Sequence, residues 1–265
     1  MLYALVVIYN KNCNESLSLQ SLIKYKNKIK IIVYDNSTKN YNNKAFCDKN
    51  KIAYYSFLEN NGLSKAYNYV LKHIKKTSED YILILDDDTK LNSNYINEIM
   101  RNVKDCNYDI YLPVIRANNK IISPSNVQFH CRIKSVKKIE NIDMRKISAI
   151  NSGMVIRTVV FKDISYNEEL FLDYVDHDFM KKVRKHYSIK ILNNPIEQNY
   201  SRFKKGSINS EIIRFKIYKK DYKKYCSECN RRLFYILSIS FYSIKKCIKY
   251  KTLKFLLIFG GRNER

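Results

Sequence analysis

A strongly apolar run from Tyr81 to Leu85 is followed directly by three consecutive aspartates, Asp86, Asp87 and Asp88. The run has the length and composition of a buried strand, so the carboxylates lie where a strand leaves the core and enters a loop. Clustered anions repel one another, and a site that gathers them usually holds a cation as well. Hard carboxylate oxygens suit Mg²⁺ or Mn²⁺, which are often shared with substrate phosphates. This segment therefore predicts a divalent metal site that grips a diphosphate.

The first half of the chain alternates between strand-like and helix-like segments. Strands are predicted at 2–9, 30–34, 51–57 and 81–85, and helices at 15–26, 63–74 and 94–103. This βαβα rhythm predicts a parallel, doubly wound sheet of the α/β class. Neither GxGxxG nor GxxxxGK[ST] is present, which argues against a dinucleotide Rossmann site and against a P-loop.

Polar residues follow the first, second and fourth of these strands. Ligands of doubly wound sheets bind beyond the carboxyl ends of the strands, so these residues should converge on one crevice. Asn61 and Gly62, which begin the helix after the third strand, should lie on the same rim. The strand-end residues are Tyr9, Asn10, Asp35, Asn36, Ser37 and the aspartates 86–88.

The chain carries a formal net charge of +24, from 49 Lys and Arg against 25 Asp and Glu. Such a field attracts polyanions: nucleic acid, anionic lipid headgroups or phosphorylated substrates. Lys, Asn, Ile and Tyr are abundant together, as AT-rich coding would produce, so part of the charge has this alternative origin.

The odd count of seven cysteines, without a signal peptide, favours reduced thiols in a cytosol. Cys226 and Cys229 form a single CxxC, a weak zinc signal without a second pair.

The pattern becomes irregular from about 109 to 149 and then regains order. Asn151-Ser152-Gly153 is a small-residue turn that runs into a strand. Residues 168–184 are acidic at the start and basic at the end, as a helix dipole favours. Beyond about residue 208 acidic residues thin out, and Lys, Arg, Tyr, Ile and Phe dominate. We therefore expect a boundary near 205, between a first domain, 1–205, and a basic amphipathic helical tail, 206–265.

A set of ordered motifs across roughly residues 3 to 200 resembles one family. The chain is similar to the family 2 inverting glycosyltransferases, and within them to the bacterial rhamnosyltransferase-like enzymes of capsule and cell-surface polysaccharide synthesis. The resemblance implies a GT-A fold, with a doubly wound, mainly parallel nucleotide-sugar-binding sheet as the catalytic domain and a C-terminal basic helical appendage. Each motif is weak alone, and their order and spacing carry the resemblance. The motifs lie at 7–10, 33–37, 60–68, 85–89, 151–153 and 169–179.

The resemblance implies roles for the strand-end residues. An inverting transferase needs a base for the acceptor hydroxyl and a cation that stabilises the departing nucleoside diphosphate. By resemblance, Asp86 and Asp88 form a DxD pair that holds Mg²⁺ or Mn²⁺, with Asp88 as the direct ligand and Asp86 contacting the ribose or supporting the metal through water. Asp35 resembles the acid that reads the nucleobase edge. The other implied donor-site residues are Tyr9, Asn10, Asn36, Asn61, Gly62, Lys65, Asn68 and Asp87.

Asp176 is the candidate general base. Many relatives read Glu-Asp-x-Asp here, whereas Val175 precedes Asp176 in this chain, as in the Asp-Tyr-Val-Asp form of the rhamnosyltransferase-like branch. Asp173 and Asp178 are the alternatives, and Asp178 could instead brace the helix. Relatives often carry a further His after the base; residues 193–201 offer no clean equivalent, and the four histidines lack metal-ligand spacing.

The basic tail indicates a second kind of partner. Residues 212–225 and 233–250 mix apolar and basic residues at roughly helical spacing, and the longest nearly uncharged run, 233–244, is too short to span a bilayer. Lysine-flanked aromatic helices of this kind can lie in a membrane interface, so we expect docking on an anionic membrane surface. Packing on the catalytic domain or on another subunit is the alternative. The implied partners, a dTDP- or UDP-linked sugar donor and a polyprenyl-linked glycan acceptor, place the chain in the cytoplasm at the inner face of the cell membrane.

Two other functions compete with sugar transfer. A metal-dependent nucleotidyltransferase also uses carboxylates on an α/β sheet, but it usually requires a basic Gly-rich loop that residues 10–14 do not supply. A nucleic-acid-binding protein would explain the charge, but the first 200 residues show no module with interleaved basic and aromatic residues, so no nucleic-acid partner is expected. The resemblance favours rhamnose from dTDP-rhamnose as the donor sugar, with UDP-linked hexoses, including galactofuranose, as alternatives.

Overall fold

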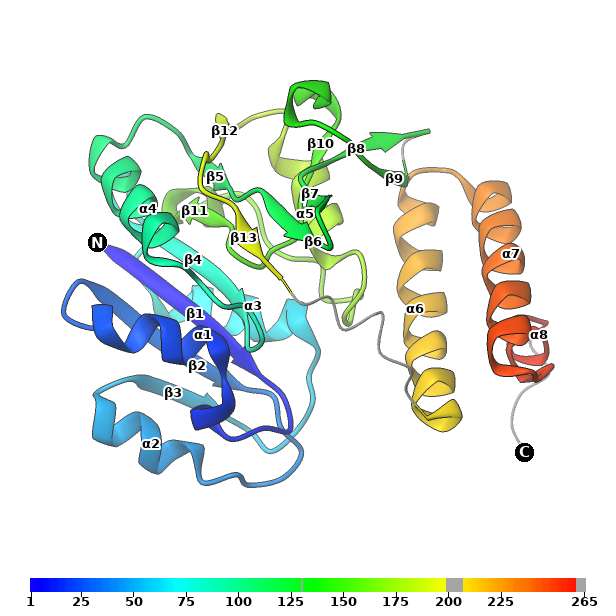
Figure 1. Ribbon diagram of the computed structural model, residues 1–265, viewed down its shortest axis with the longest axis horizontal. Helices are drawn as coiled ribbons and strands as arrows, with labels where there is room; N and C mark the ends of the chain where they lie inside the picture. The colour runs from blue at the N-terminus through cyan, green and yellow to red at the C-terminus, as the bar shows by residue number, and fades with distance from the viewer. Residues whose placement is uncertain (130, 199–206, 261–265) are drawn as a thin grey trace.

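A computed structural model describes residues 1–129, 131–198 and 207–260 of the chain. Its central feature is a seven-stranded sheet in the order β12-β5-β11-β4-β1-β2-β3 (Figure 1). The strands are β1 (Leu2–Ile8), β2 (Ile29–Asp35), β3 (Ala53–Ser56), β4 (Tyr81–Asp86), β5 (Ile110–Leu112), β11 (Val155–Arg157) and β12 (Ile189–Ile191).

The main sheet is parallel apart from one strand. β1 pairs in parallel with β2 and β4, β2 with β3, and β5 with β12. β11 runs antiparallel between β4 and β5. All seven residues of β1 are buried, as expected of a central strand that is covered on both faces. The prediction of a mainly parallel, doubly wound α/β sheet is confirmed.

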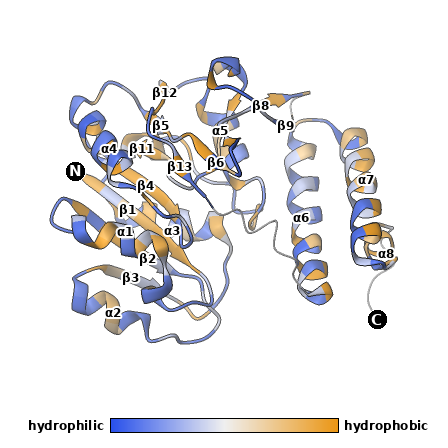
Figure 2. Cartoon of the chain, viewed as in Figure 1, coloured by the Kyte–Doolittle hydropathy of each residue, from blue (hydrophilic) through white to orange (hydrophobic). Residues whose placement is uncertain are grey.

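Helices cover both faces of this sheet, and the apolar strands lie between them (Figure 2). Successive residues of β1 point to opposite faces, so Leu5 and Val6 belong to two different buried clusters. α1 (Leu17–Leu22), α2 (Asn43–Asn50) and α4 (Ser93–Asp105) pack into the cluster with Val6. α3 (Leu63–His73) and α5 (Val175–Val183) pack into the cluster with Leu5.

Two three-stranded sheets complete the described strands, in the orders β13-β6-β7 and β10-β8-β9. Their strands are β6 (Ile115–Ala117), β7 (Lys120–Ser123), β8 (Ser125–Gln128), β9 (Arg132–Ser135), β10 (Ile147–Ser148) and β13 (Ile196–Glu197). Single 3₁₀ turns lie at Cys13–Glu15, Ile23–Tyr25, Ile139–Asn141, Met144–Lys146 and Thr158–Lys162.

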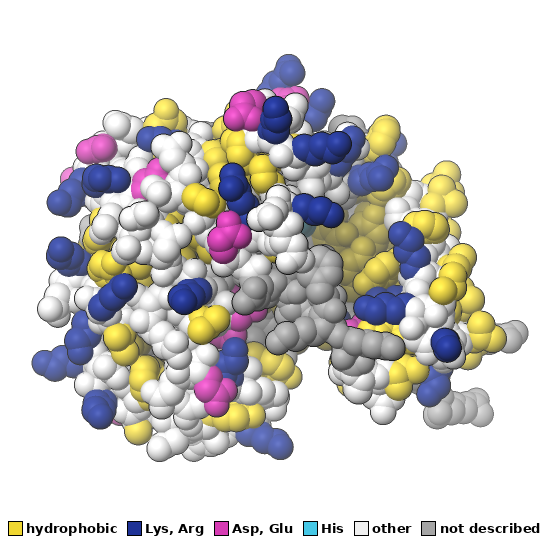
Figure 3. Space-filling model, viewed as in Figure 1, with side chains coloured by type: hydrophobic (Ala, Val, Ile, Leu, Met, Phe, Trp, Pro, Cys, Tyr) yellow, Lys and Arg dark blue, Asp and Glu magenta, His cyan; other side chains and the backbone are white. Residues whose placement is uncertain are grey.

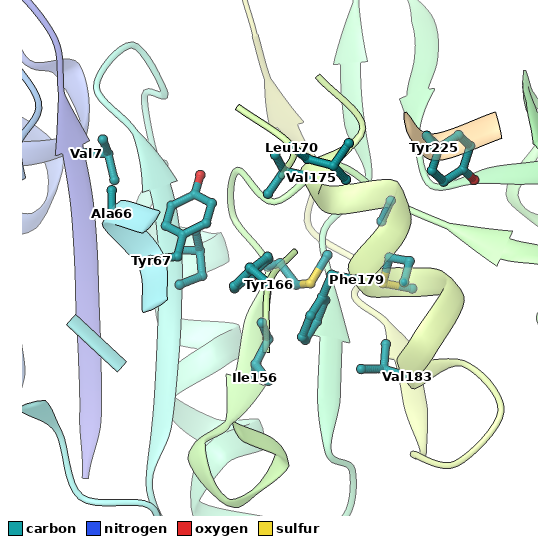
Figure 4. Packing of buried hydrophobic residues seen from close by; sticks show 14 of the residues in the cluster. Val7, Ala66, Tyr67, Ile156, Tyr166, Leu170, Val175, Phe179, Val183 and Tyr225 are labelled. Carbon is teal, nitrogen blue, oxygen red and sulfur yellow. The ribbon is translucent and has the colours of Figure 1, made fainter. Parts of the chain in front are cut away.

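The described C-terminal part of the chain forms three helices, α6 (Ile208–Glu228), α7 (Arg232–Tyr250) and α8 (Lys254–Phe259), with α6 lying between α7 and the rest of the molecule (Figure 1). Phe215 and Tyr225 of α6 belong to the same buried cluster as Leu5, and Tyr225 lies next to α5 (Figure 4). The core beneath α3 and α5 therefore continues into the C-terminal helices. The boundary expected near residue 205 lies outside the described residues. Among the described helices, none has both the length and the apolar character needed to cross a membrane.

Two segments differ from the sequence-based expectation. α2 is not indicated by the sequence, because Asn43–Asn50 contains only three apolar residues and no apolar stripe. The helix expected over 168–184 begins instead at Val175. The backbone N–H groups of residues 171–173 donate to the side chain of Asp221, which holds this stretch as a loop rather than as a helical turn.

Candidate active site

Three of the predicted site segments meet at the carboxyl edge of the parallel sheet. In the strand register, Ile8 of β1 lies opposite Asp35 at the end of β2. On the other side, Val7 lies opposite Asp86 at the end of β4. The loops that leave these strands therefore start side by side, as the carboxyl ends of parallel strands do.

Side-chain contacts join these three loops. The N–H of Asn10, after β1, donates to Ser37 Oγ, after β2, at 2.8 Å. Lys11 Nζ lies 2.7 Å from Asp87 Oδ1, after β4. Lys11 is not part of the sequence motifs. Its position in the loop after β1, which the sequence predicts to face the acidic cluster, is the sequence signal that could have indicated this ion pair.

Asp35 is only 2% exposed, and much of its hydrogen-bonding capacity is used within the chain. Its Oδ2 accepts from Asn43 Nδ2 at 2.7 Å and from the hydroxyl of Tyr54 at 2.9 Å. Its Oδ1 accepts from the N–H of Ser37 at 3.0 Å. Asp35 thus fastens the loop after β2 to α2 and β3, and its Oδ1 keeps capacity for a further donor.

A small amide network shapes the entry to α3. Asn36 Nδ2 donates to Asn60 Oδ1 at 3.0 Å, and Asn36 Oδ1 accepts from the N–H of Asn61 at 2.9 Å. Asn60 Oδ1 also accepts from the N–H of Gly62 at 3.1 Å. Asn36 and Asn61 therefore hold the loop between β3 and α3. Tyr9, which follows β1, is 49% exposed.

Gly62 lies where α3 meets the loop that precedes Asp176. Its φ is +79°, and an added Cβ would lie 2.7 Å from both Cδ2 and the carbonyl oxygen of Phe171. The next N–H, that of Leu63, donates to the same carbonyl at 2.7 Å. Only glycine fits this backbone approach. Lys65, in the first turn of α3, is exposed.

Two polar side chains of α3 hold the loop before α5. Asn68 Nδ2 donates to the carbonyl oxygen of Tyr166 at 2.9 Å and to Glu168 Oε1 at 3.0 Å. Asn68 Oδ1 accepts from the N–H of Tyr166 at 3.1 Å. Ser64 Oγ donates to the carbonyl oxygen of Leu170. The conformation of this loop is therefore set in part by α3, which lies far from it in the sequence.

The three aspartates after β4 form an acidic centre. Burial, followed by repulsion from Asp88, Asp87 and Asp176, raises the pKa of Asp86 to about 7. Burial and the charge of Asp87 also raise the pKa of Asp88, against the opposing effect of Lys11. With a pKa of about 7, the Asp86 carboxyl group is only partly ionised at neutral pH, and a cation placed beside it would favour the ionised form.

Hydroxyl groups fix the backbone that carries these aspartates. Ser18 Oγ, on α1, contacts the carbonyl oxygen of Asp86 and lies 2.9 Å from that of Thr89. Ser152 Oγ accepts from the N–H of Asp86 at 3.4 Å and hydrogen-bonds with Thr89 Oγ1. The Asn-Ser-Gly turn thus supports the acidic centre through Ser152. Beyond it, Asp88 lines a cavity of about 270 Å³.

Asp176 lies in the first turn of α5, near enough to Asp86 for its charge to act on that carboxyl group. After burial, the charge of Asp176 is among the causes that raise the pKa of Asp86 and of Tyr67. Asp176 Oδ1 accepts from the N–H of His177 at 2.7 Å, and 20% of the side chain is exposed. His177 Nδ1 in turn lies 2.8 Å from Ser148 Oγ, which anchors the start of α5 to β10.

The two other acids near Asp176 are engaged by cations. Asp173 is buried against Arg214 of α6, with Arg214 Nη2 2.7 Å from its Oδ1 and Nη1 in contact with its Oδ2. Asp178 Oδ2 lies 2.9 Å from Lys182 Nζ, one turn further along α5. Asp178 therefore braces the helix, and of the three acids Asp176 is the one whose charge contributes to the raised pKa of Asp86.

α6 organises the loop that leads to Asp176. The fully buried Asp221 accepts from the N–H groups of residues 171, 172 and 173 at 3.0, 2.8 and 2.9 Å. Tyr174 stacks on Tyr222 and Tyr225, with ring centroids 4.9 and 4.8 Å away. The sequence motifs do not include Asp221. Its one sequence signal is that it stands alone among lysines in the middle of α6.

The acidic centre supplies oxygen ligands suited to a hard divalent cation. Among the described residues, no three His, Cys, Asp or Glu side chains come together as a complete metal site, and this holds for the CxxC of Cys226 as well. Mg²⁺ typically takes one or two carboxylates and completes its shell with water and substrate phosphates. Asp86 and Asp88 fit that mode of binding. His130 lies outside the described residues.

Comparison with known proteins bears on the family. A family model described as glycosyl transferase family 2 matches residues 4–165. The chain is 25% identical over 186 residues to the dTDP-rhamnosyl transferase RfbF of Shigella flexneri, which covers 67% of this chain and 61% of that protein. The chain thus spans about three fifths of the length of this relative.

Two solved structures share the fold. S. aureus TarS superposes with a TM-score of 0.54 at 18% identity, over 88% of this chain and 43% of the TarS chain. The structure of GalNAc-T7 with UDP, GalNAc and Mn²⁺ gives a TM-score of 0.57 at 13% identity, over 93% of this chain and 57% of that chain. At such identities the likeness shows the fold alone, and it confirms the expected GT-A fold. Since the family match spans more than half of its 265 residues, this chain belongs to glycosyl transferase family 2.

Proposed function

We propose that this chain is an inverting glycosyltransferase that moves a sugar from a nucleoside-diphosphate sugar to a hydroxyl of a surface-polysaccharide precursor. The observation that carries the proposal is geometric: in the strand register Asp35 and Asp86 lie on either side of the end of β1, and Asp176 lies close enough for its charge to act on Asp86. An inverting displacement needs a base for the incoming hydroxyl and an electrostatic partner for the leaving diphosphate. In this proposal Asp176, from the start of α5, supplies the base, and the aspartates after β4 hold the cation that stabilises the leaving diphosphate.

The nucleoside binds, in this proposal, to the loops after β1 and β2. Asp35 accepts an N–H of the base through Oδ1, the oxygen with a single donor inside the chain. Tyr9 and Asn10 line the same pocket from the loop after β1. Asn36 contributes by holding the adjoining loop against its neighbours.

The diphosphate end of the donor binds on the α3 and β4 side. Asn61, Gly62 and Asn68 shape this rim, and the exposed Lys65 supplies a positive charge. Asp86, Asp87 and Asp88 form its acidic wall. Asp88, supported by Asp86, would hold Mg²⁺ or Mn²⁺, and the ion would offset the charge on the leaving diphosphate. The presence of UDP and Mn²⁺ in the GalNAc-T7 structure supports this choice of ion.

Asp176 is the proposed general base. As the acceptor oxygen attacks the anomeric carbon, Asp176 takes the hydroxyl proton, and the bond from that carbon to the diphosphate oxygen breaks with inversion. The diphosphate leaves with the electron pair of that bond. Asp173 and Asp178 are less suited to this task, because each is already paired with a cation.

The names of similar proteins support two classes of donor. The dTDP-rhamnosyl transferase RfbF supports dTDP-rhamnose, which we favour, and the TarS structures with UDP and UDP-GlcNAc support a UDP-linked hexose as the alternative. We propose a polyprenyl-linked glycan as the acceptor. The reaction would then take place in the cytoplasm, at the inner face of the cell membrane.

A panel of dTDP- and UDP-linked sugars tests the proposal, with binding followed by thermal shift in the presence of Mn²⁺ and turnover by release of the nucleoside diphosphate. We expect one donor to stabilise the protein, and Asp88→Ala to lose the Mn²⁺-dependent part of that stabilisation. Asp48→Ala, which removes an exposed acid of α2, is the matched control.

Two outcomes would assign another function. Release of pyrophosphate with transfer of a nucleotide would indicate a nucleotidyltransferase. Tight oligonucleotide binding without binding of any sugar nucleotide would indicate a nucleic-acid-binding protein. In either case the assignment of Asp176 as a glycosyl-transfer base would be withdrawn.

A further inference from the structure

α7 turns one face to the core and the opposite face to solvent. Its buried residues recur every four positions, at Tyr235, Ile239, Ser243 and Cys247. With about 100° between successive residues, its most exposed apolar residues fall together on the opposite side. They are Leu233, Leu237, Phe241, Ile244 and Ile248, with exposures of 69, 63, 60, 46 and 73%.

α8 adds to this apolar surface. Leu253, just before α8, and Leu257, within it, are 70% and 51% exposed. We call these seven residues, which lie on α7, on α8 and just before α8, the outer apolar face. Figure 3 shows hydrophobic side chains exposed along the outer edge of the helical unit, with Lys and Arg among them. Contiguous exposed apolar surface of this kind usually marks a site of interaction.

The charge around the outer apolar face has a single sign. Residues 229–260 contain seven Lys and Arg and no Asp or Glu. Lys245 Nζ lies 4.4 Å from the ring centroid of Phe241, so a cation borders the apolar stripe directly. The partner of this surface should therefore combine apolar material with negative charge.

We propose that the outer apolar face docks on an anionic lipid bilayer, with its leucine and isoleucine side chains in the acyl boundary and its lysines among the headgroups. An amphipathic helix with lysines beside its apolar stripe is suited to that interface. A second copy of the chain fits less well, since pairing two such faces would bring cations together without carboxylates from residues 229–260. Nucleic acid would match the charge but leave the apolar stripe unexplained.

The structure also corrects which segment carries the face. The sequence indicated residues 212–225 as well as 233–250, but the apolar residues of α6 point largely inward. Phe215 and Tyr222 of α6 are buried, and Arg214 is paired with Asp173. The docking surface therefore belongs to α7 and α8, while α6 joins them to the catalytic domain. This inference is independent of the transferase proposal.

Vesicle co-sedimentation of the full chain tests the inference. Vesicles of phosphatidylcholine alone are compared with vesicles that contain phosphatidylglycerol. We expect binding to the anionic vesicles, at least tenfold weaker binding to the neutral ones, and weakening by salt. The double variant Leu237→Ser, Phe241→Ser should bind anionic vesicles at least tenfold more weakly, and Lys245→Gln, Lys249→Gln should lose most of the anionic preference.

The matched control is Phe129→Ser, which removes an aromatic residue of similar exposure, 67%, outside the outer apolar face. This variant should bind like the wild type, and unchanged thermal unfolding of all variants would exclude misfolding as the cause. Equal vesicle binding by the Leu237, Phe241 variant and the wild type would overturn the inference. A second result would also overturn it: the wild type does not bind vesicles and instead forms a concentration-dependent dimer in sedimentation, and the Leu237, Phe241 variant does not form this dimer. The outer apolar face would then bind a second copy of the chain.

Discussion

The loop after β2 and the loop before α5 each bring an aspartate to the site, but different parts of the chain hold them. Asp35 is held by Ser37, Asn43 and Tyr54, all within 19 residues of it in the sequence. The loop before Asp176 is held instead by Asn68 of α3, 98 residues away, and by Asp221 of α6, about 50 residues away.

This difference separates two functions of the site. The proposed nucleoside pocket rests on turns that form between adjacent elements of the sheet. The position of the proposed base depends on the C-terminal helices, because α6 contributes the acceptor for three backbone N–H groups of its loop. Changes in α6 should therefore impair transfer while donor binding is kept. Asp176→Asn and Asp221→Ala test that separation directly, and the two other variants test the contacts and charges on which the site depends.

Asp176→Asn should have the largest effect. An amide cannot take the hydroxyl proton, so we expect kcat to fall by about 10³-fold or more, while donor affinity stays within about twofold. Steady-state kinetics and donor titration measure the two quantities. Asp178→Asn is the comparison, since its carboxylate is paired with Lys182, and a larger loss of kcat there would reassign the base.

Gly62→Ala should disturb both the loop between β3 and α3 and the loop before Asp176. A Cβ at φ +79° would press on the backbone of Phe171, so we expect the free energy of unfolding to fall by about 2–4 kcal/mol. Chemical denaturation measures this loss. Gly260→Ala is the control, because its nearest neighbouring atom would be 3.7 Å away, and an equal loss in both variants would contradict the steric argument.

Asp221→Ala should act mainly on the base loop. Three backbone N–H groups would lose their acceptor, and we expect a loss of about 2 kcal/mol in stability and a roughly tenfold fall in kcat with donor affinity kept. Hydrogen exchange at residues 171–173 should accelerate in parallel. Asp221→Asn, which retains one acceptor oxygen, should lie between this variant and the wild type. A fall in donor affinity that exceeds the fall in kcat would break the separation of the two functions.

Asp86→Asn should change the free energy of unfolding in a way that depends on pH. The pKa of Asp86 is about 7 in the folded protein against about 4 in an unfolded chain. Between these values the unfolded state loses its proton first, so stability falls as pH rises through this window. Without added metal, the variant should be more stable than the wild type at pH 8, by at most the roughly 4 kcal/mol that a shift of about three pKa units represents. The difference should vanish near pH 4. A pH-independent difference in urea denaturation would contradict this account.

Much of the central sheet could be predicted, because buried strands leave apolar runs. The run before Asp86 marks β4, and the polar residues after it and after Tyr34 mark the carboxyl edge. α2 is not predicted, because Asn43–Asn50 buries little apolar surface and its apolar residues therefore show only a weak helical periodicity. The sequence indicates a strand after Asn151-Ser152-Gly153, and β11 lies there, but its antiparallel direction has no local signal, since direction depends on which neighbours a strand pairs with.

The sequence by itself determined the α/β class and placed Asp35 and Asp86 at the carboxyl ends of parallel strands, because alternation of apolar and polar segments is a local property of the chain. Only the tertiary structure decided that Asp173 and Asp178 are paired with cations, that Asp221 holds the base loop and that α7 rather than α6 carries the outer apolar face. Each of these depends on contacts between residues of different elements. Such contacts leave no periodic trace in the sequence, since their partners come together only when the elements pack.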